Sequence, residues 1–220
     1  MSPFNFEQAR FNMIEQQIRP WDVLDQRTLD LIASVPREQF VPEDYRKLAF
    51  ADINIPLAQG QVMMSPKVEA RLLQALRLNP NDSVLEIGTG SGYLTALLAK
   101  VTKHVDSVDI FPEFIQAVEI KLTALNINNV RLQVGNAING WNTDVDYNVI
   151  VLTGSIPVLT SHFQNQLEEG GCLFAIIGEE PIMQAQLITK INQTKTNREL
   201  LFETVLPPLV GSESQKRFVL

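Results

Sequence analysis

The sequence has little of the material that several common classes of protein need. It holds 1 cysteine and 2 histidines in 220 residues. The single cysteine excludes an intrachain disulfide framework and a Cys-rich zinc site, and the histidines leave little for a His-based metal site. We therefore expect no bound metal. No stretch approaches the roughly 18 consecutive apolar residues of a membrane span, and no basic region followed by an apolar one opens the chain. These absences predict a cytoplasmic protein without a membrane partner.

Positive charge is also scarce. The chain has 18 Lys and Arg against 25 Asp and Glu, which gives a net charge of −7 and a pI near 4.9. Proteins that bind nucleic acid usually need a basic face, so we expect no such partner. Hydrophobic residues make up 45% of the chain, enough for a proper core. With no repeat and no Gly/Ser/Pro-rich linker, the length predicts one domain, and we expect a monomer.

Three segments of different texture make up this domain. Residues 1–80 carry helical apolar spacing over 4–18 and again after Asp25, followed by a proline-punctuated stretch. Residues 81–180 alternate strands and helices, which predicts a doubly wound, mostly parallel sheet of α/β class. The expected strands are 83–88, 104–109, 130–134, 147–152 and 172–177, and the expected helices are 92–101, 112–125 and 158–167. Residues 181–220 predict a C-terminal antiparallel hairpin from 184–191 and 199–206.

The most informative segment is 84–93, which reads VLEIGTGSGY. It is a strand that runs into a glycine-rich turn and opens a helix, the place where open α/β sheets bind nucleotides. Glycine lets the backbone approach a ligand, and the helix start offers free N–H groups. The spacing G-x-G-x-G and the acid Glu86 differ from the dinucleotide fingerprint G-x-G-x-x-G and resemble the S-adenosylmethionine site of class I, Rossmann-like methyltransferases. Asp109 ends the next strand, where an acid can accept both ribose hydroxyls. The alternative is a tight turn that binds no ligand.

Further motifs extend this resemblance to nearly the whole chain. They are VPREQFVP at 35–42, HVDSVD at 104–109, Gly140-Trp141, Gln166-Leu167 with Gly170-Gly171, and the closing segment 206–210. Together with the glycine turn, they resemble the protein-L-isoaspartate (D-aspartate) O-methyltransferase family. The resemblance implies a carboxyl methyltransferase that uses S-adenosyl-L-methionine and repairs L-isoaspartyl or D-aspartyl residues in damaged proteins or peptides. It also implies cofactor contacts from Glu86, Gly88, Thr89, Gly90, Ser91, Gly92, Asp109, Ile110, Asn136 and Ala137.

The chain departs from the family where the substrate meets the methyl group. The family pattern G-Q-T-I-S-x-P reads GQVMMSP at 60–66, so that Val62 replaces a threonine and Met64 replaces a serine that is a proposed catalytic hydroxyl. Methionine cannot donate a hydrogen bond to a carboxylate. The candidate catalytic residues are therefore Gln61, Met64 and Ser65. Ser65 can supply the hydroxyl only if the loop shifts, and the alternative is that it caps the following helix.

Two other interpretations stay open. Met63 and Met64 either fill gaps in the core, as methionine usually does, or line a pocket more apolar than the family norm. The adenine-side loop reads Gly135-Asn136-Ala137 in place of G-D-G, and the Asn136 side-chain oxygen can still accept from the adenine amino group. The departures therefore leave two alternatives to isoaspartyl repair. One is a methyltransferase of the same fold with a changed, small-molecule substrate, and the other is a catalytically impaired protein that binds S-adenosylmethionine. The segment 207–210 is expected to form a wall of the substrate site.

Overall fold

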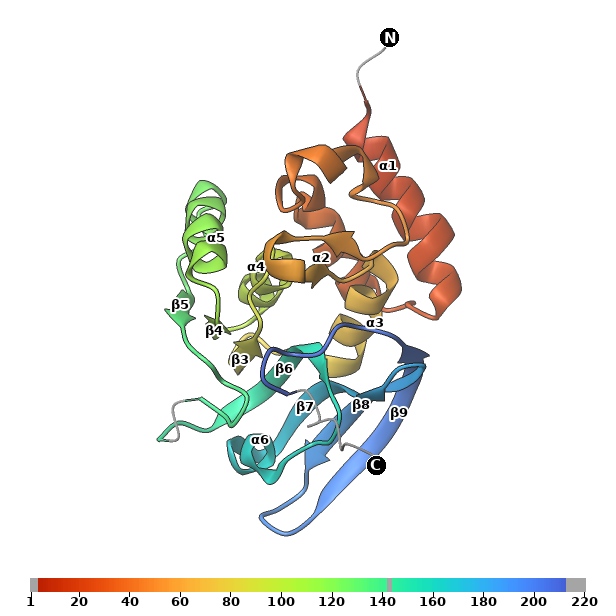
Figure 1. Ribbon diagram of the computed structural model, residues 1–220. Coiled ribbons are helices and arrows are strands. Elements are labelled where there is room, and N and C mark those ends of the chain that lie inside the picture. Colours follow the sequence, from red (N-terminus) through yellow and green to blue (C-terminus); the bar gives the residue numbers. More distant parts are fainter. Residues whose placement is uncertain (1–3, 142–143, 213–220) are drawn as a thin grey trace, which may run out of the picture.

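A seven-stranded sheet runs through the computed structural model, which describes residues 4–141 and 144–212 (Figure 1). Its strands are β3 (Ser83–Ile87), β4 (His104–Asp109), β5 (Val130–Val134), β6 (Tyr147–Ile156), β7 (Leu167–Glu179), β8 (Ile182–Lys190) and β9 (Thr196–Thr204). They lie in the order β5-β4-β3-β6-β7-β8-β9. The strands from β5 across to β7 are parallel, and β8 and β9 add an antiparallel hairpin at the edge.

Helices and short turns surround this sheet (Figure 1). The α-helices are α1 (Phe6–Met13), α2 (Gln26–Ser34), α3 (Pro66–Leu76), α4 (Tyr93–Val101), α5 (Pro112–Ala124) and α6 (Ser161–Asn165). A π-helical turn (Ile14–Ile18) follows α1, and the 3-10 turns are Arg19–Trp21, Arg37–Gln39, Glu43–Leu48 and Ala58–Gly60. A separate two-stranded sheet pairs β1 (Ile55–Pro56) with β2 (Val62–Met63). Among the residues that the structure describes, no helix is both long and apolar enough to cross a membrane.

The central strands are apolar on both faces because protein covers both faces. In β6, Val149 and Val151 belong to a hydrophobic cluster with the N-terminal helices, whereas Ile150 and Leu152 belong to a second cluster that includes Phe163 of α6. Successive side chains of a strand point to opposite faces. A parallel strand buried on both sides therefore reads as a continuous apolar run, as the sequence YNVIVL does.

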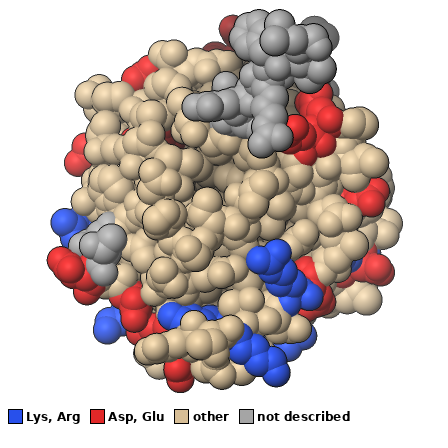
Figure 2. Space-filling model, turned by 60° about the horizontal axis from the view of Figure 1, so that its bottom comes forward, with Lys and Arg blue, Asp and Glu red and all other residues tan. Residues whose placement is uncertain are grey.

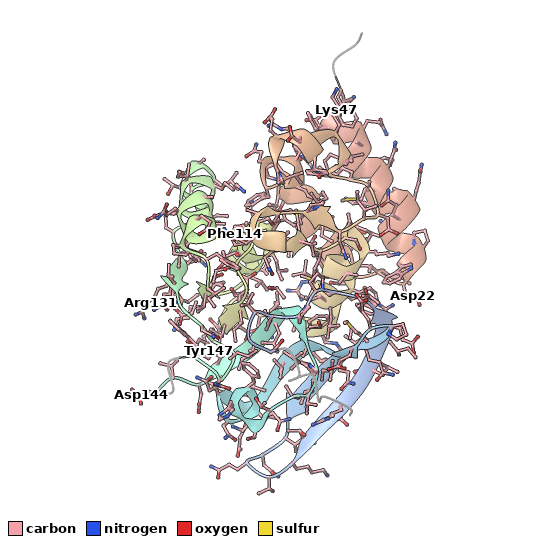
Figure 3. All side chains as sticks on the ribbon, in the orientation of Figure 1. Asp22, Lys47, Phe114, Arg131, Asp144 and Tyr147 are labelled. Carbon is pink, nitrogen blue, oxygen red and sulfur yellow. The ribbon has the colours of Figure 1, made fainter. Side chains whose placement is uncertain are left out.

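The strand order reverses at β3, and this places the site. From β3 the chain moves outward through β4 to β5, and it then returns to pair β6 with the other side of β3. Ligands bind open α/β sheets outside the carboxyl ends of the strands at such a switch point. Phe114 follows the carboxyl end of β4 and Tyr147 begins β6, so the two mark opposite ends of the strands (Figure 3).

The fold class predicted from the sequence is confirmed, including the C-terminal hairpin. Three predicted elements are wrong in their length. The helix expected over 158–167 is only α6, with 5 residues, and the strands expected over 147–152 and 172–177 extend to 10 and 13 residues. The chain stays in strand through Ile156 because Ser155 exchanges backbone hydrogen bonds with Pro207 and Leu209. Strand β7 then begins at Leu167, so that little length is left for a helix.

Acidic side chains are spread around the face that Figure 2 shows, and uncharged residues make up most of it. Lys and Arg side chains on this face lie mainly in its lower half (Figure 2).

Candidate functional site

The glycine turn between β3 and α4 requires its glycines. Gly88, Gly90 and Gly92 have φ angles of +97°, +51° and +82°, a region that side chains with a Cβ rarely adopt. A Cβ on Gly88 would lie 2.1 Å from the Thr153 hydroxyl oxygen, and one on Gly92 would lie 2.6 Å from Val118. The turn therefore combines a left-handed backbone with close approach of its neighbours. Two of its glycines, Gly88 and Gly90, also line a pocket.

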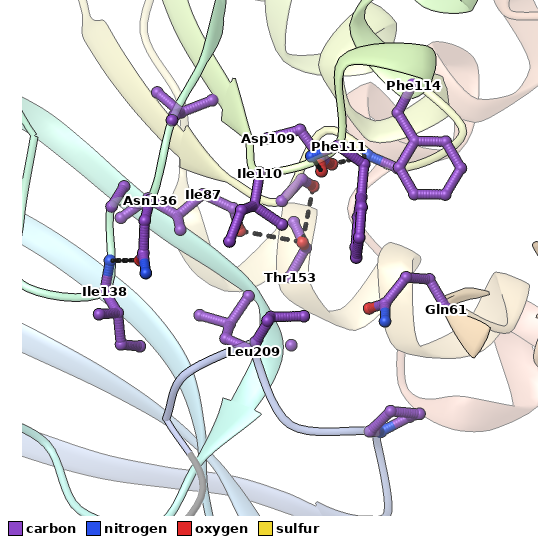
Figure 4. Close-up of a pocket in the computed structure, with 18 of the residues that line it drawn as sticks. Gln61, Ile87, Asp109, Ile110, Phe111, Phe114, Asn136, Ile138, Thr153 and Leu209 are labelled. Atoms are coloured by element: carbon purple, nitrogen blue, oxygen red, sulfur yellow. Dashed lines mark hydrogen bonds between the residues drawn. The ribbon is translucent and has the colours of Figure 1, made fainter. Parts of the chain in front are cut away.

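Asp109 lies against this turn from the end of β4. Its Oδ2 accepts the Gly90 N–H at 2.8 Å, and its Oδ1 accepts the Phe111 N–H at 2.9 Å. Burial raises the pKa of the Asp109 carboxyl, and these backbone hydrogen bonds act in the opposite direction. Figure 4 shows the carboxylate at the upper wall of the pocket. Fixed in this way, the Asp109 carboxylate can accept hydrogen bonds from the hydroxyl groups of a ligand.

A pocket opens at the carboxyl ends of the strands, between the glycine turn, the β1–β2 hairpin and the C-terminal segment 206–210. Its lining residues are Gln61, Val62, Ile87, Gly88, Gly90, Val108, Asp109, Ile110, Phe111, Phe114, Gly135, Asn136, Ala137, Ile138, Thr153, Gly154, Leu206, Pro207, Leu209 and Val210. Asp109 is the only charged residue among them. The pocket therefore suits a ligand that pairs hydroxyl or amino groups with a carboxylate and buries apolar surface.

The structure divides the predicted cofactor residues into two groups. Those that line the pocket are Gly88, Gly90, Asp109, Ile110, Asn136 and Ala137. Those that do not are Glu86, Thr89, Ser91 and Gly92, which lie within or beneath the turn. The Thr89 hydroxyl, for example, is buried against the Ser107 hydroxyl at 2.7 Å. The second group shapes the turn and offers no side chain to the pocket.

Glu86 lies beneath the turn and does not line the pocket, so its predicted contact with the cofactor stays a prediction. Its side chain is fully buried, and its Oε2 accepts the hydroxyls of Thr95 and Ser107, each at 2.5 Å. It points to this side because side chains of β3 alternate between the faces of the sheet, and Glu86 faces α4. Burial raises the pKa of Glu86 to about 8, although the two hydroxyls act to lower it.

Glu86 is expected to make the folded protein less stable as the pH rises. The raised pKa keeps Glu86 protonated in the folded state up to about pH 8, whereas the same group in the unfolded state titrates near 4.5. Its stabilising contribution is therefore complete below pH 4.5 and is lost as the pH rises through 8. Glu86→Gln stays neutral and can still accept from both hydroxyls. Urea unfolding at pH 5, 7 and 8.5 should show the variant gaining stability relative to the parent; parallel curves for the two proteins would contradict this.

Asn136 lines the pocket, and its predicted role toward adenine stays a prediction. Its Oδ1 accepts the N–H of Ile138 at 3.1 Å (Figure 4). A carbonyl oxygen has two lone pairs, so one acceptor position remains for a ligand amino group. Ile110 and Ile138 also line the pocket and provide apolar surface. The Trp141 ring packs against Gly135, where a Cβ would lie 2.5 Å from it.

In the segment 60–66, Gln61 and Val62 line the pocket, whereas Met64 and Ser65 do not. Figure 4 shows Gln61 across the pocket from Asn136. Met63 and Met64 are 3% and 4% exposed and belong to the hydrophobic core. The interpretation of the methionines as core residues is therefore confirmed, and the alternative that they line the pocket is wrong. Core packing holds Met64 away from a ligand.

Ser65 occupies a helix-capping position but makes no capping hydrogen bond. It is the N-cap residue of α3, and its side chain makes no capping hydrogen bond. Its own N–H donates to the Asn54 Oδ1 at 3.0 Å. Since the Ser65 side chain is buried outside the pocket lining, the loop has not shifted to bring this hydroxyl toward the site.

The C-terminal segment forms the opposite wall, as the sequence predicts. Leu206, Pro207, Leu209 and Val210 line the pocket. Strand β6 holds the segment in place, because the Ser155 hydroxyl donates to the Leu206 carbonyl oxygen at 2.8 Å. This wall is apolar on its pocket side.

Sequence reasoning missed the aromatic pair Phe111 and Phe114, whose rings lie edge to face with centroids 5.7 Å apart. Both line the pocket. The available signal was their position directly after Asp109, where the chain leaves the strand end that carries the site. Aromatic side chains in a loop and first helical turn at that edge face a ligand more readily than the core.

The chain is similar to known proteins in both sequence and structure. A family model described as protein-L-isoaspartate(D-aspartate) O-methyltransferase matches residues 8–214. A solved structure from Plasmodium falciparum, named as a protein-L-isoaspartate O-methyltransferase in complex with S-adenosyl-L-homocysteine, is 19% identical with a TM-score of 0.77, over 94% of this chain and 98% of that one. A second protein-L-isoaspartate O-methyltransferase is 22% identical with a TM-score of 0.79, over 94% of this chain and 67% of that one. At these identities the two structures show the shared fold.

Proposed function

The chain belongs to the protein-L-isoaspartate(D-aspartate) O-methyltransferase family, and from this premise we propose that it methylates the carboxylate of L-isoaspartyl and D-aspartyl residues in damaged proteins or peptides, with S-adenosylmethionine as methyl donor. One observation supports this most strongly. The glycine turn and Asp109 face one pocket at the switch point of the sheet. Gln61 and Val62 face the same pocket, and they begin the segment Gln61–Met64, which is called the acceptor segment from here on. A donor and an acceptor can therefore meet there.

The residues of the pocket fit the proposed donor. Asp109 is in place to accept ribose hydroxyls, and the left-handed turn at Gly88 and Gly90 leaves room for the backbone to approach. In bound S-adenosylmethionine, the second acceptor position of Asn136 would take the adenine amino group, and Ile110 would provide apolar surface to the ring. When bound, S-adenosylmethionine supplies a methyl group on a sulfonium, which a carboxylate oxygen can bond while the departing sulfur keeps the electron pair.

The chain has to orient the acceptor, and it needs no general base. Carboxyl groups titrate near pH 4, so the acceptor is ionised at neutral pH. Among the lining residues no Lys, Arg or His faces it. The Gln61 side-chain amide lines the pocket three residues before position 64, where the family has a hydroxyl. One of its N–H groups donates to the Gln59 carbonyl oxygen, and the other can donate to the acceptor. Apolar walls exclude water, and alignment of the reacting atoms at about 3 Å then supplies most of the rate.

A second candidate is a small-molecule carboxylate or other apolar acceptor. The observation that favours it is the wall itself, where Val62 and the segment Leu206–Val210 present apolar side chains without a cation. A third possibility, binding of S-adenosylmethionine without turnover, follows from the Met64 side chain, which lies in the core and supplies no hydroxyl.

Transfer of labelled methyl to an isoaspartyl peptide is the direct test, with the matching aspartyl peptide as control. We expect saturable methylation of the isoaspartyl peptide alone. S-adenosylhomocysteine binding, measured by calorimetry on the same protein, separates the alternatives. Binding without transfer to the peptide would overturn isoaspartyl repair, and a screen of small carboxylic acids would then distinguish a changed acceptor from lost catalysis.

A further inference from the structure

Arg37 is a buried, positively charged residue that does not line the pocket. It lies in the 3-10 turn Arg37–Gln39, and its side chain is 0% exposed. Its Nε donates to the Ala49 carbonyl oxygen at 2.8 Å, and its Nη2 donates to the Met64 carbonyl oxygen at 2.6 Å. Its Nη1 forms an ion pair with Glu69 in α3. One guanidinium thus holds the end of the acceptor segment, two residues after Val62.

The same guanidinium packs against the helix that follows the glycine turn. Its central carbon lies 4.8 Å from the centroid of the Tyr93 ring. Tyr93 begins α4 immediately after Gly92, and the Phe40 ring meets its edge at 5.6 Å. Lys121 adds a second link, because its Nζ donates to the carbonyl oxygens of Ser91 and Phe40 at 3.1 and 3.3 Å. Arg37 and Phe40 therefore contact Tyr93 directly, and Lys121 links Phe40 to Ser91 on the other side of Gly92.

Only arginine can make this set of contacts. Its planar guanidinium presents donors in fixed directions and stacks on an aromatic face, whereas a lysine ammonium is a compact charge without that plane. Arg37 therefore links two parts of the site that are far apart in sequence. One is the backbone that ends at Met64, and the other is the turn that ends at Gly92. Arg37 itself is absent from the pocket lining.

We propose that Arg37 is a positioning residue that holds the acceptor segment Gln61–Met64 at a set distance from the glycine turn. Its consequence for turnover rests on the proposed methyl transfer. Displacing a reacting group by about 1 Å can reduce the rate about 100-fold. Loss of Arg37 should therefore lower kcat and leave cofactor binding in place.

The test variant removes both members of the ion pair. Removing one partner of a buried pair leaves an uncompensated charge, whereas replacing both by apolar residues is often tolerated. The variant is therefore Arg37→Leu with Glu69→Leu. The matched control is Arg10→Leu with Glu38→Leu, which removes a neighbouring ion pair with an N–O distance of 2.8 Å, in which the Arg10 guanidinium donates to the Glu38 carboxylate and not to the Met64 carbonyl oxygen. Thermal unfolding establishes that both double variants fold.

The position of the acceptor segment can be measured without turnover. Proteins labelled with ¹³C at the methionine methyl groups give NMR signals from Met63 and Met64, with the buried Met13 and Met183 as internal references. We expect the Met63 and Met64 signals to shift or broaden in the Arg37/Glu69 variant and to stay in place in the Arg10/Glu38 variant. If they stay in place in a folded Arg37/Glu69 variant, the proposal is overturned.

Kinetics supply the second readout. In the Arg37/Glu69 variant we expect kcat to fall about 100-fold, with the Kd for S-adenosylhomocysteine changed less than about threefold. Wild-type kcat in this variant would also overturn the proposal. If the parent protein methylates no isoaspartyl peptide, the proposed function fails, and the methionine signals still decide whether Arg37 holds the segment.

Discussion

Gly88→Ala is expected to weaken S-adenosylhomocysteine binding by about 100-fold or more, as measured by calorimetry. A residue with a Cβ costs about 1–2 kcal/mol in the left-handed region, and Gly88 has φ +97°. The added Cβ would also lie 2.1 Å from the Thr153 hydroxyl oxygen. Thr153 must then move and lose its hydrogen bonds to the Ile87 and Gly88 carbonyl oxygens, at about 1 kcal/mol each. The variant can relieve this strain by changing the shape of the turn, which lines the pocket, whereas Gly170 does not. A ligand must then restore the original turn at a cost of about 3 kcal/mol, which corresponds to roughly 100-fold in affinity.

Gly170→Ala is the matched control for this prediction. Gly170 has φ +83°, close to that of Gly88, but nothing lies within 4 Å of its Cβ position. It should therefore show the backbone cost alone, about 1–2 kcal/mol of stability, with unchanged ligand binding. Equal loss of binding in both variants would mean that general destabilisation is responsible and that the turn at Gly88 does not cradle the ligand.

Much of the fold followed from patterns that depend on sequence alone. The alternation of apolar strands and helices from residue 83 predicts the parallel sheet because each strand is buried on both faces. The glycine turn was identifiable for a similar reason, since few other residues tolerate its backbone. The length of α6 could not be predicted in this way. It depends on the hydrogen bonds of Ser155 to Pro207 and Leu209, which come from a distant part of the chain.

The site was predictable where regular structure fixes direction. Asp109 ends a strand, so its place at the carboxyl edge follows from the topology. Glu86 lies in a strand too, and counting by two from the buried Val84 would have placed it on the α4 face and away from the pocket. The loop at 60–66 has no such period. Which of its side chains face the pocket is decided by Arg37 and by core packing, and neither leaves a mark in the local sequence.

Met64→Ser is expected to destabilise the protein by about 2–5 kcal/mol without raising methyl transfer. The side chain is 4% exposed and belongs to the hydrophobic core. Truncating a buried methionine to a small residue costs energy in this range because a cavity remains, and a hydroxyl placed there adds a polar group to an apolar environment. Urea unfolding measures the first effect, and the labelled-methyl assay with isoaspartyl peptide measures the second.

Two companion variants make this prediction discriminating. Met64→Leu conserves volume and should cost less than about 1.5 kcal/mol. Val62→Thr restores the family's hydroxyl at a position that lines the pocket, so any gain in transfer should come from this variant alone. A rise in transfer from Met64→Ser would mean that the serine hydroxyl reaches the acceptor. Position 64 would then face the pocket during turnover, and the core position of Met64 would be a consequence of the substitution itself.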